Sequence, residues 1–300
     1  MRDLEALAAY LGNVTGALAS RYGLKDNRNS TLDCLKIVMA SPGDYLGVAH
    51  ALRNDVFELN LVHSTDLFTW TQIATLDTHA SQGELHRNPD GSYLVAYEHD
   101  EPNSNFIRLR RYANRTALEA NRYAAQITLG RTLAPTAEGT PSFDRVTPEE
   151  ISLRFHYYRN ADVDRAARGI LRNWQRWQPA PDESINRAIE AFGVQGNIGS
   201  RSRFVLNGTP YYLQEGQGAK NDWASWRLYL VEGGEDQDKR KAVAIPMKTH
   251  AGSTSFANPA ITVLDEPGRI PRLFITAFLP TQGNPEGERG ELAYLLDLPR

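Results

Sequence analysis

Residues 84–100 read Glu84-Leu-His-Arg-Asn88-Pro-Asp90-Gly91-Ser-Tyr93-Leu-Val-Ala-Tyr-Glu-His-Asp100, which is the pattern of a β-hairpin. The second half is rich in aromatic and β-branched residues, and such residues favour an extended strand. The Asp90-Gly91 pair is a strong signal for a tight turn, because both residues tolerate positive φ angles. A shorter extended segment, Glu84 to His86, precedes the turn. The sequence therefore predicts two antiparallel strands joined at residues 88–91.

The same unit recurs five times along the chain. The predicted second strands are Tyr45–Ala51, Tyr93–Asp100, Ile151–Tyr158, Tyr211–Gln217 and Arg272–Phe278. They start roughly 50 to 60 residues apart, a period typical of propellers and solenoids. A third extended segment follows each hairpin, at Phe57–His63, Asn105–Tyr112, Ala166–Leu171, Ser225–Val231 and Glu291–Leu296. Five antiparallel units of three or four strands predict an all-β fold, a five-bladed β-propeller.

The predicted blades run approximately over residues 30–78, 79–133, 134–192, 193–248 and 249–300, so that residues 1–300 form one propeller domain. Two segments, Met1–Leu24 and Asp182–Ala191, instead have apolar residues at a spacing near that of a helix. The first is expected either as a short N-terminal helix or as an outer strand that closes the ring. The second is expected as a helical insert. A β-sandwich is the alternative fold, but a sandwich has no reason to repeat one unit.

Composition limits the classes of function. With 41% hydrophobic and 23% charged residues, the chain is typical of a globular protein with a proper core. A net charge of −3 argues against nucleic acid or an anionic membrane as a partner. No segment approaches the roughly 18 apolar residues of a membrane span. Residues 1–23 lack the pattern of an export signal, and because a trimmed signal would leave the same sequence, the cellular location stays open. Cys34 is the only cysteine, which excludes an intramolecular disulfide and a multi-thiolate metal site.

Carboxylates stand near the start of three consecutive predicted blades. The innermost strand of each blade lines the propeller's central channel, so residues at the starts of different blades are expected to converge. The five blade-start residues are Asp33, Glu84, Glu138, Arg201 and Asn258. Gathered carboxylates are costly in a plain core, where they must be paired or protonated, and are expected in a site. Asp33, Glu84 and Glu138 are therefore the candidate catalytic residues.

A second set of candidate residues follows from antiparallel pairing. The end of each second strand returns beside the start of the first, which brings further polar residues to the same place. These candidate substrate-binding residues are Glu98, Asp100, His156 and Glu215, with His250 just before the fifth blade, and the blade-start residues Arg201 and Asn258 are candidates for the same role. Trp223 and Trp226 are the aromatic candidates, because the C–H faces of sugars stack on flat rings. Trp174 and Trp177 are instead expected to pack between blades.

Two short motifs carry a resemblance to a known family. His63-Ser-Thr-Asp-Leu-Phe-Thr-Trp70 and Glu138-Gly-Thr-Pro141 resemble motifs of the five-bladed glycoside hydrolases of family 43, the arabinanase and β-xylosidase type. The resemblance implies Asp33 as general base, Glu84 as an orienting residue and Glu138 as general acid. Cys34 after Asp33, Glu rather than Asp at position 84 and the inserted Thr140 depart from the family's pattern. The chain therefore resembles a distant relative of that family.

The predicted function is cleavage of a glycosidic bond in an oligosaccharide or polysaccharide by a monomeric enzyme that needs no cofactor. Such cleavage requires one carboxyl group as proton donor and another as base or nucleophile. Two alternatives stay open. Arg201 could neutralise a uronate while a histidine or tyrosine removes the α proton, as in a polysaccharide lyase, or the propeller could bind glycans without cleaving them. The family resemblance also suggests a single structural Ca²⁺ ion in the channel, held by His250 and water.

Overall fold

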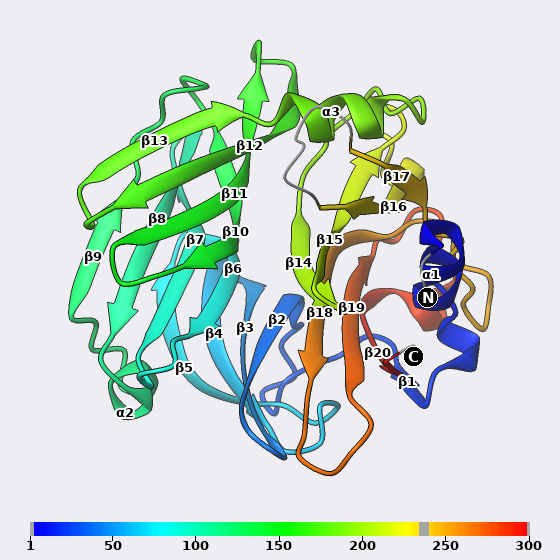
Figure 1. Ribbon diagram of the computed structural model, residues 1–300, viewed down its shortest axis with the longest axis horizontal. Helices are drawn as coiled ribbons and strands as arrows, with labels where there is room; N and C mark the ends of the chain where they lie inside the picture. The colour runs from blue at the N-terminus through cyan, green and yellow to red at the C-terminus, as the bar shows by residue number, and fades with distance from the viewer. Residues whose placement is uncertain (1–2, 234–239, 299–300) are drawn as a thin grey trace. The chain divides into compact units, whose positions relative to one another are not determined.

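A computed structural model describes residues 3–233 and 240–298, and over these residues the fold is mostly β-strand. Within this part of the chain, twenty strands form five four-stranded antiparallel sheets (Figure 1). The sheets are the blades of a five-bladed β-propeller, which confirms the predicted fold class. The chain divides into two compact units. Unit 1 comprises Met1–Leu24, Val163–Arg165 and Asp182–Arg300, and unit 2 comprises Lys25–Asp162 and Ala166–Pro181. One domain over residues 1–300 stays a prediction.

Unit 2 contains the first three blades, which are consecutive hairpins extended by an outer strand. The strands of blade one are β2 (Asp33–Ser41), β3 (Asp44–Arg53), β4 (Val56–Ser64) and β5 (Thr71–Thr78). Blade two is formed by β6 (Ala80–Arg87), β7 (Tyr93–Glu101), β8 (Ser104–Tyr112) and β9 (Ala125–Thr128), with α2 (Arg115–Glu119) before β9. Blade three is formed by β10 (Glu138–Val146), β11 (Glu150–Arg159), β12 (Val163–Arg172) and β13 (Arg176–Pro181), and the first three residues of β12 belong to unit 1.

Unit 1 contains the last two blades. Blade four is formed by β14 (Arg201–Leu206), β15 (Thr209–Gln217), β16 (Trp226–Glu232) and β17 (Ala242–Ala244). Blade five is formed by β18 (Ala257–Leu264), β19 (Arg272–Leu279), β20 (Gly290–Asp297) and β1 (Ala19–Arg21). The helices are α1 (Leu4–Leu11) and α3 (Glu183–Glu190), and short 3-10 turns lie at Val14–Gly16, Trp223–Ser225 and Glu286–Glu288.

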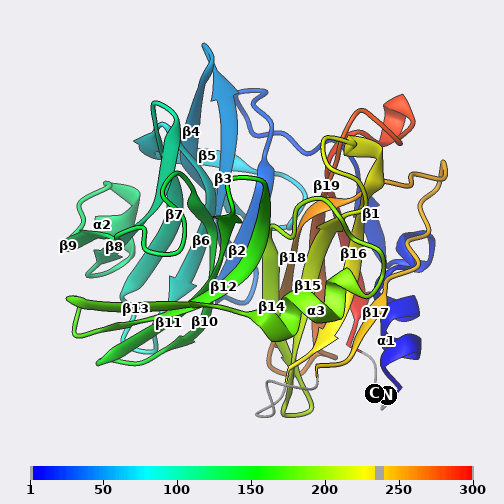
Figure 2. The same cartoon turned by 90° about the horizontal axis from the view of Figure 1, so that it is seen from above.

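The N-terminal segment forms both the short helix and the outer strand that were predicted as alternatives. Asp3 caps α1 by accepting a hydrogen bond from the Glu5 backbone N–H, and Leu7 and Leu11 join the hydrophobic core of unit 1. The helix lies against β16 and β17 (Figure 2). The chain then forms β1, which pairs with β20 as the outer strand of blade five. The predicted helix after Asp182 is also present, as α3.

The blades of unit 2 pack against one another through alternating side chains. Along β7, Tyr93 and Val95 join a core cluster with residues of β3 and β4, whereas Leu94 and Ala96 join a cluster with residues of β10 and β11. Successive side chains of a strand point to opposite faces of the sheet, so a strand buried on both faces has an almost continuous apolar sequence. This explains why the second strands are the clearest signal in the sequence.

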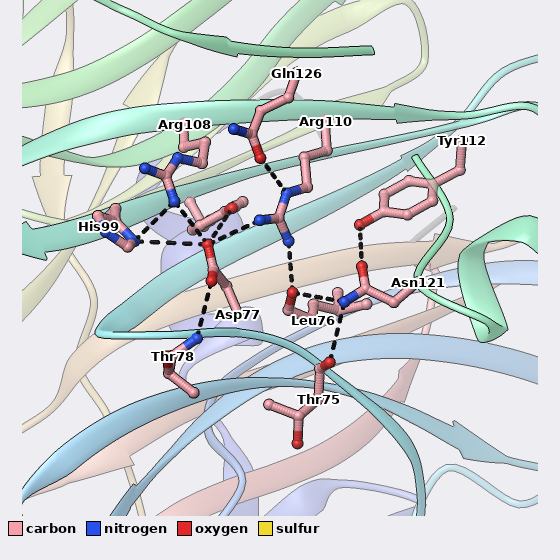
Figure 3. A network of polar contacts seen from close by, with 11 residues as sticks. Thr75, Leu76, Asp77, Thr78, His99, Arg108, Arg110, Tyr112, Asn121 and Gln126 are labelled. Carbon is pink, nitrogen blue, oxygen red and sulfur yellow. Dashed lines mark hydrogen bonds and ion pairs between the residues drawn. The ribbon is translucent and has the colours of Figure 1, made fainter. Parts of the chain in front are cut away.

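A polar network also joins blade one to blade two within unit 2 (Figure 3). Asp77 of β5 accepts hydrogen bonds through Oδ2 from the Tyr97 hydroxyl at 2.6 Å, Arg108 Nη1 at 2.9 Å and Arg110 Nη2 at 3.0 Å. Arg110 also donates to the Leu76 carbonyl oxygen. The network satisfies buried charges between the sheets, and it explains why these charged residues tolerate burial.

The first strands of four blades carry a bulge near their start. Pairing with the second strand shifts register directly after Asp33, Ser81, Gly139 and Ala257. The next residue in each case has a positive φ angle: 57° at Cys34, 52° at Gln82, 44° at Thr140 and 48° at Asn258. In β14 the register is unbroken from Arg201 to Leu206. Bulges bend a strand and re-aim its side chains, so they decide which groups face one another at the starts of the blades.

Candidate active site

The three predicted catalytic carboxylates do not occupy equivalent positions in their blades. Asp33 directly precedes the residue of positive φ in its blade, whereas Glu84 lies two residues after Gln82 and Glu138 two residues before Thr140. The prediction that they share one position is therefore wrong. The reason is that β6 begins at Ala80, four residues before Glu84, and that the bulges insert residues that sequence spacing does not reveal.

Glu84 connects the first strands of three consecutive blades. Its Oε2 lies 2.9 Å from Lys36 Nζ of β2, and its Oε1 accepts a hydrogen bond from the Phe143 backbone N–H of β10 at 3.1 Å. Lys36 is buried, so the ion pair neutralises a charge that burial would otherwise make costly. With both carboxylate oxygens engaged by neighbouring blades, Glu84 has the contacts of a structural residue.

Glu138 is fixed to the loop that precedes its own strand. Its Oε1 accepts hydrogen bonds from the backbone N–H groups of Thr132, Leu133 and Ala134, at 2.7, 2.6 and 3.2 Å. The residue is only 2% exposed. Three backbone donors on one oxygen hold residues 132–134 in a tight curve, and they provide the hydrogen bonds that the buried Glu138 carboxylate needs.

Asp33 differs from these two glutamates. Its Oδ2 accepts a hydrogen bond from the Thr31 hydroxyl at 3.1 Å, but its Oδ1 is buried and has no hydrogen-bond partner among the described residues. Burial raises the pKa of Asp33 from 3.8 to about 6, although the Thr31 hydroxyl acts in the opposite direction. An unpaired buried carboxylate oxygen is costly and rare, and perturbed carboxyl groups of this kind are typical of functional sites.

Asp100 is the other carboxyl group of unit 2 with a strongly perturbed pKa. Burial, and next the negative charge of Glu98, raise its pKa from 3.8 to about 6. Both residues lie at the end of β7, and the backbone of Asp100 donates a hydrogen bond to the His79 carbonyl oxygen at 2.7 Å. Asp100 is partly exposed, so solvent reaches a carboxyl group that is protonated at mildly acidic pH.

A repeated hydrogen bond joins the second strand of one blade to the bulge of the next. His50 Nδ1 accepts from the Gln82 backbone N–H at 3.3 Å, and Glu98 Oε2 accepts from the Thr140 backbone N–H at 2.9 Å. In unit 1, Glu215 Oε2 accepts from the Asn258 backbone N–H. We call these contacts the bulge latches. They give the predicted substrate-binding residues Glu98 and Glu215, and the blade-start residue Asn258, a role in joining blades.

His50 and Thr140 are the residues of this region that sequence reasoning missed. Burial lowers the pKa of His50 to about 4, and its Nδ1 acts as an acceptor, so the ring is neutral with its proton on Nε2. Thr140 Oγ1 contacts Nδ1 of the predicted residue His156, which pairs with Gly139 across β10 and β11. His50 pairs with Asp33 at the equivalent place in blade one. The rule that selected Glu98, His156 and Glu215 would also have selected His50.

The predicted site residues of unit 1 fall into buried and exposed groups. Arg201 is 2% exposed, and its guanidinium donates to Gln214 Oε1 at 3.3 Å and to the Gly199 carbonyl oxygen. His250 is exposed and its Nδ1 lies 3.0 Å from the Tyr22 hydroxyl. Arg201 is therefore held inside its own blade, whereas His250 is accessible.

The two tryptophans of unit 1 are also different in exposure. Trp223 is 49% exposed, and its ring centroid lies 6.3 Å from that of the buried Trp226. The Trp223 carbonyl oxygen accepts a hydrogen bond from the Ser255 hydroxyl at 2.6 Å, which fixes the short turn. Trp223 thus has an exposed aromatic ring, whereas Trp226 is buried beside it.

Two further observations concern metals and membranes. Among residues 3–233 and 240–298, no group of three or more His, Cys, Asp or Glu side chains could hold a metal ion. A Ca²⁺ ion held by His250 and water alone would need no such group, so that site stays a prediction. None of the helices in the described part of the chain is both long and apolar enough to cross a membrane.

Comparisons with known proteins agree with the fold. No protein-family model matches the sequence, and no curated protein matches it. Many solved structures are similar, among them three glycoside hydrolases. A thermostable family-43 glycoside hydrolase has a TM-score of 0.64 at 8% identity and covers 92% of each chain. An α-L-arabinofuranosidase from Lactobacillus brevis has a TM-score of 0.61 at 11% identity, with 90% of this chain and 94% of that chain covered.

The third similar structure is the family-93 α-L-arabinofuranosidase of Fusarium graminearum bound to arabinobiose. It has a TM-score of 0.60 at 14% identity and covers 94% of this chain and 98% of that chain. At such low identity the likeness establishes the fold and not the function. The predicted resemblance to the propeller glycoside hydrolases is therefore confirmed at the level of the fold.

Proposed function

We propose that the protein is a glycoside hydrolase and that Asp33 is the carboxylate that activates water in its active site. The observation that carries this proposal is the buried Oδ1 of Asp33, which has no hydrogen-bond partner among the described residues. Its raised pKa, about 6, makes the group a stronger base than an ordinary aspartate while it remains ionised at neutral pH. Its place beside a bulge at the start of the innermost strand agrees with the role that the family resemblance implies.

Glycoside hydrolysis also needs a proton donor. Asp100 suits this role because burial and the charge of Glu98 raise its pKa to about 6, so that it keeps its proton in mildly acidic solution. Glu138, the general acid implied by the family resemblance, has one oxygen bound to three backbone N–H groups of its own loop. We therefore propose Asp100 as the donor, and Glu138 as the residue that shapes the loop before β10.

The similar structures and Trp223 support a proposal for the substrate class. Two of those structures are α-L-arabinofuranosidases, and a further similar structure is a Penicillium chrysogenum α-L-arabinanase complexed with arabinobiose, at 12% identity and a TM-score of 0.56. We propose arabinose-containing oligosaccharides as the substrates, with the exposed ring of Trp223 as a surface on which a sugar can stack. The lyase alternative has less support, because it needs Arg201 to bind a uronate, and that guanidinium is buried and already hydrogen-bonded.

A screen of nitrophenyl glycosides and plant polysaccharides tests the proposal. Release of nitrophenol from an arabinofuranoside, with new reducing ends from arabinan, is the expected result. Asp33→Asn is expected to lower both by about 10²- to 10⁴-fold while the protein stays folded. Products with the ultraviolet absorbance of an unsaturated uronate would indicate a lyase instead. Binding without any cleavage would indicate a glycan-binding propeller and would overturn the proposal.

A further inference from the structure

A cavity of about 440 Å³ lies in unit 2, on residues that the proposed active site does not use. It is lined by the turn between β6 and β7, by the turn between β10 and β11, and by the hairpin that joins β12 to β13. The lining side chains that matter here are Asn88, Asp90, Arg111, Val146, Ile151 and Trp174. A volume of this size is within the range of ordinary ligand sites.

This cavity is well separated from the starts of the blades. It contacts Asn88, directly after the end of β6, whereas the bulge at Gln82 lies near the beginning of the same strand. A strand rises about 3.3 Å per residue, so the two places are roughly 20 Å apart along β6. A ligand in the cavity would therefore not reach the carboxyl groups proposed for catalysis.

Trp174 adopts a backbone conformation that its residue type disfavours. It has a φ angle of 57°, and Asn173 before it has 51°. Asparagine tolerates this left-handed region, but for a residue as bulky as tryptophan it is an outlier. The turn is held by hydrogen bonds from the Asn173 N–H to the Glu149 carbonyl oxygen and from the Gln175 N–H to the Arg172 carbonyl oxygen. Such strain, held by its surroundings, is characteristic of functional sites.

Core packing alone does not explain the position of Trp174. Trp177, three residues later, already covers the sheet, since its ring lies so close to Gly169 that an added Cβ there would be 2.2 Å from it. Trp174 packs against the same core cluster of unit 2 as Trp177, but it also lines the cavity, half-buried, with the Arg111 guanidinium 5.7 Å from its ring centroid. Both tryptophans therefore have the packing role that the sequence predicts, and Trp174 in addition presents part of its ring to the cavity.

The lining combines an aromatic ring with planar polar groups that carry positive and negative charge. A flat indole ring can stack on the C–H face of a sugar, and Arg111 offers several N–H donors for sugar hydroxyl groups. Asp90 and Asn88 supply acceptor oxygens in the same lining, and the Asp90 side chain is held by hydrogen bonds from the Ser92 N–H and hydroxyl at 2.9 and 2.7 Å. One cation balanced by one anion suits a neutral ligand rather than a uronate or a phosphate.

We propose that this cavity is a second carbohydrate-binding site, which holds a neutral sugar of a polysaccharide by stacking on Trp174 and by hydrogen bonds from Arg111. It lies apart from the catalytic groups and would keep the enzyme attached to a polymeric substrate between cleavage events. The choice of arabinose-containing polymers as ligands rests on the proposed function, but the site itself does not require catalysis.

Affinity electrophoresis in native gels that contain arabinan or arabinoxylan tests this proposal. All variants are made in the Asp33→Asn background, so that the polymer is not consumed during the run. We expect the parent protein to be retarded by at least one of the two polymers. Trp174→Gly and Arg111→Ala should each weaken this retardation about tenfold, as expected for the loss of one stacking or charged contact. Trp174→Phe, which keeps an aromatic ring, should retain part of it.

The variants are chosen so that misfolding does not decide the result. Trp174→Gly creates an Asn-Gly turn, which favours positive φ at both positions and preserves the hairpin. Gln175→Ala is the matched control, because Gln175 is exposed on the same hairpin but is not part of the cavity lining. Equal retardation of Trp174→Gly, Arg111→Ala and Gln175→Ala would overturn the second site, as would a parent protein that neither polymer retards.

The result also separates this inference from the proposed hydrolase function. If retardation depends on Trp174 but the wild-type protein cleaves no glycoside, the second binding site is supported and the proposed hydrolase function is overturned. If the wild-type protein cleaves glycosides but retardation does not depend on Trp174, the hydrolase function is supported and the second binding site is overturned.

Discussion

Oε2 of Glu98 on β7 lies 2.9 Å from the backbone nitrogen of Thr140 on β10, and this hydrogen bond joins the second strand of one blade to the bulge of the next. The other oxygen of Glu98 accepts a hydrogen bond from the Asn105 side chain. The approach is so close that a Cβ atom on Gly139 would lie 1.9 Å from Glu98 Oε2. Glycine at position 139 is therefore required by the latch itself.

The first prediction concerns this latch. Glu98→Ala leaves the Thr140 N–H buried without an acceptor, so the free energy of unfolding should fall by on the order of 2 kcal/mol. Gly139→Ala should destabilise the protein as well, because the Glu98 side chain must leave its position. Urea unfolding measures both changes. Glu101→Gln is the control, since Glu101 is exposed at the end of the same strand. A Glu98→Ala variant as stable as this control would show that the latch contributes nothing.

The second prediction concerns stability and activity at Asp33. Because burial raises its pKa from 3.8 in the unfolded chain to about 6 in the folded protein, the folded state binds the proton more tightly. Its contribution to stability is therefore present in acid and is lost as the pH rises through about 6. Asparagine does not ionise, so the Asp33→Asn variant does not lose this stability as the pH rises. At pH 7 the variant should be more stable than the wild type by on the order of 2 kcal/mol.

Thermal unfolding of Asp33→Asn and wild type at several pH values measures this effect. The difference in Tm should be positive at neutral pH, shrink as the pH falls through about 6, and vanish below about pH 3, where the wild-type carboxyl group is protonated in both states. Glycosidase activity should fall by about 10²- to 10⁴-fold, as for the loss of a general base. A variant that is both less stable at pH 7 and fully active would contradict the proposed environment and role of Asp33.

The third prediction concerns Asp100 as the proton donor. Activity should require an ionised Asp33 and a protonated Asp100, and since both have pKa values of about 6, the pH profile should be a narrow bell centred near 6. Asp100→Asn should cleave natural oligosaccharides poorly, because their leaving groups need a proton. It should cleave a dinitrophenyl glycoside almost normally, because that leaving group does not.

The contrast between the two substrates separates a proton donor from a residue that only shapes the site. Glu138→Gln serves as the comparison: we expect lower stability, with equal effects on both substrates. If Glu138→Gln, and not Asp100→Asn, loses activity selectively on the poor leaving group, the general acid is Glu138, as the family resemblance implies.

The sequence predicts the fold well where side chains alternate regularly along a strand. It does not predict the places where a bulge interrupts that alternation. The second strands could be predicted because residues such as Val95 and Leu94 are buried on opposite faces of one strand. The equivalence of Asp33, Glu84 and Glu138 could not, because a bulge adds a residue without any sequence signal, and Cys34 and Gln82 are not residues that usually mark positive φ. The contacts of Glu138 depend on three backbone N–H groups, which no side-chain pattern reveals.

The fourth prediction concerns Asp77, the acceptor at the centre of the network in Figure 3. Burial would raise its pKa, but the hydrogen bond from Tyr97 and the charges and hydrogen bonds of Arg110 and Arg108 outweigh burial and hold the pKa below its usual value. For a carboxyl group whose pKa is lowered in the folded state, the stabilising effect is present above the unfolded pKa and is lost as the pH falls through the folded pKa. Asp77 should therefore contribute to stability at neutral pH and lose that contribution in acid.

Asp77→Asn tests this role, because it leaves the charges of Arg108 and Arg110 uncompensated between two blades. We expect a loss on the order of 3 kcal/mol in urea unfolding at pH 7, whereas Tyr97→Phe, which removes one hydrogen bond and keeps both ion pairs, should cost about 1 kcal/mol. The difference between Asp77→Asn and wild type should begin to shrink below about pH 4, where the carboxyl group becomes protonated in the unfolded chain, and should be lost as the pH falls through the lower pKa of the folded protein. A loss that is the same at pH 7 and in acid would mean that the shape of the Asp77 side chain, and not its charge, holds the blades together.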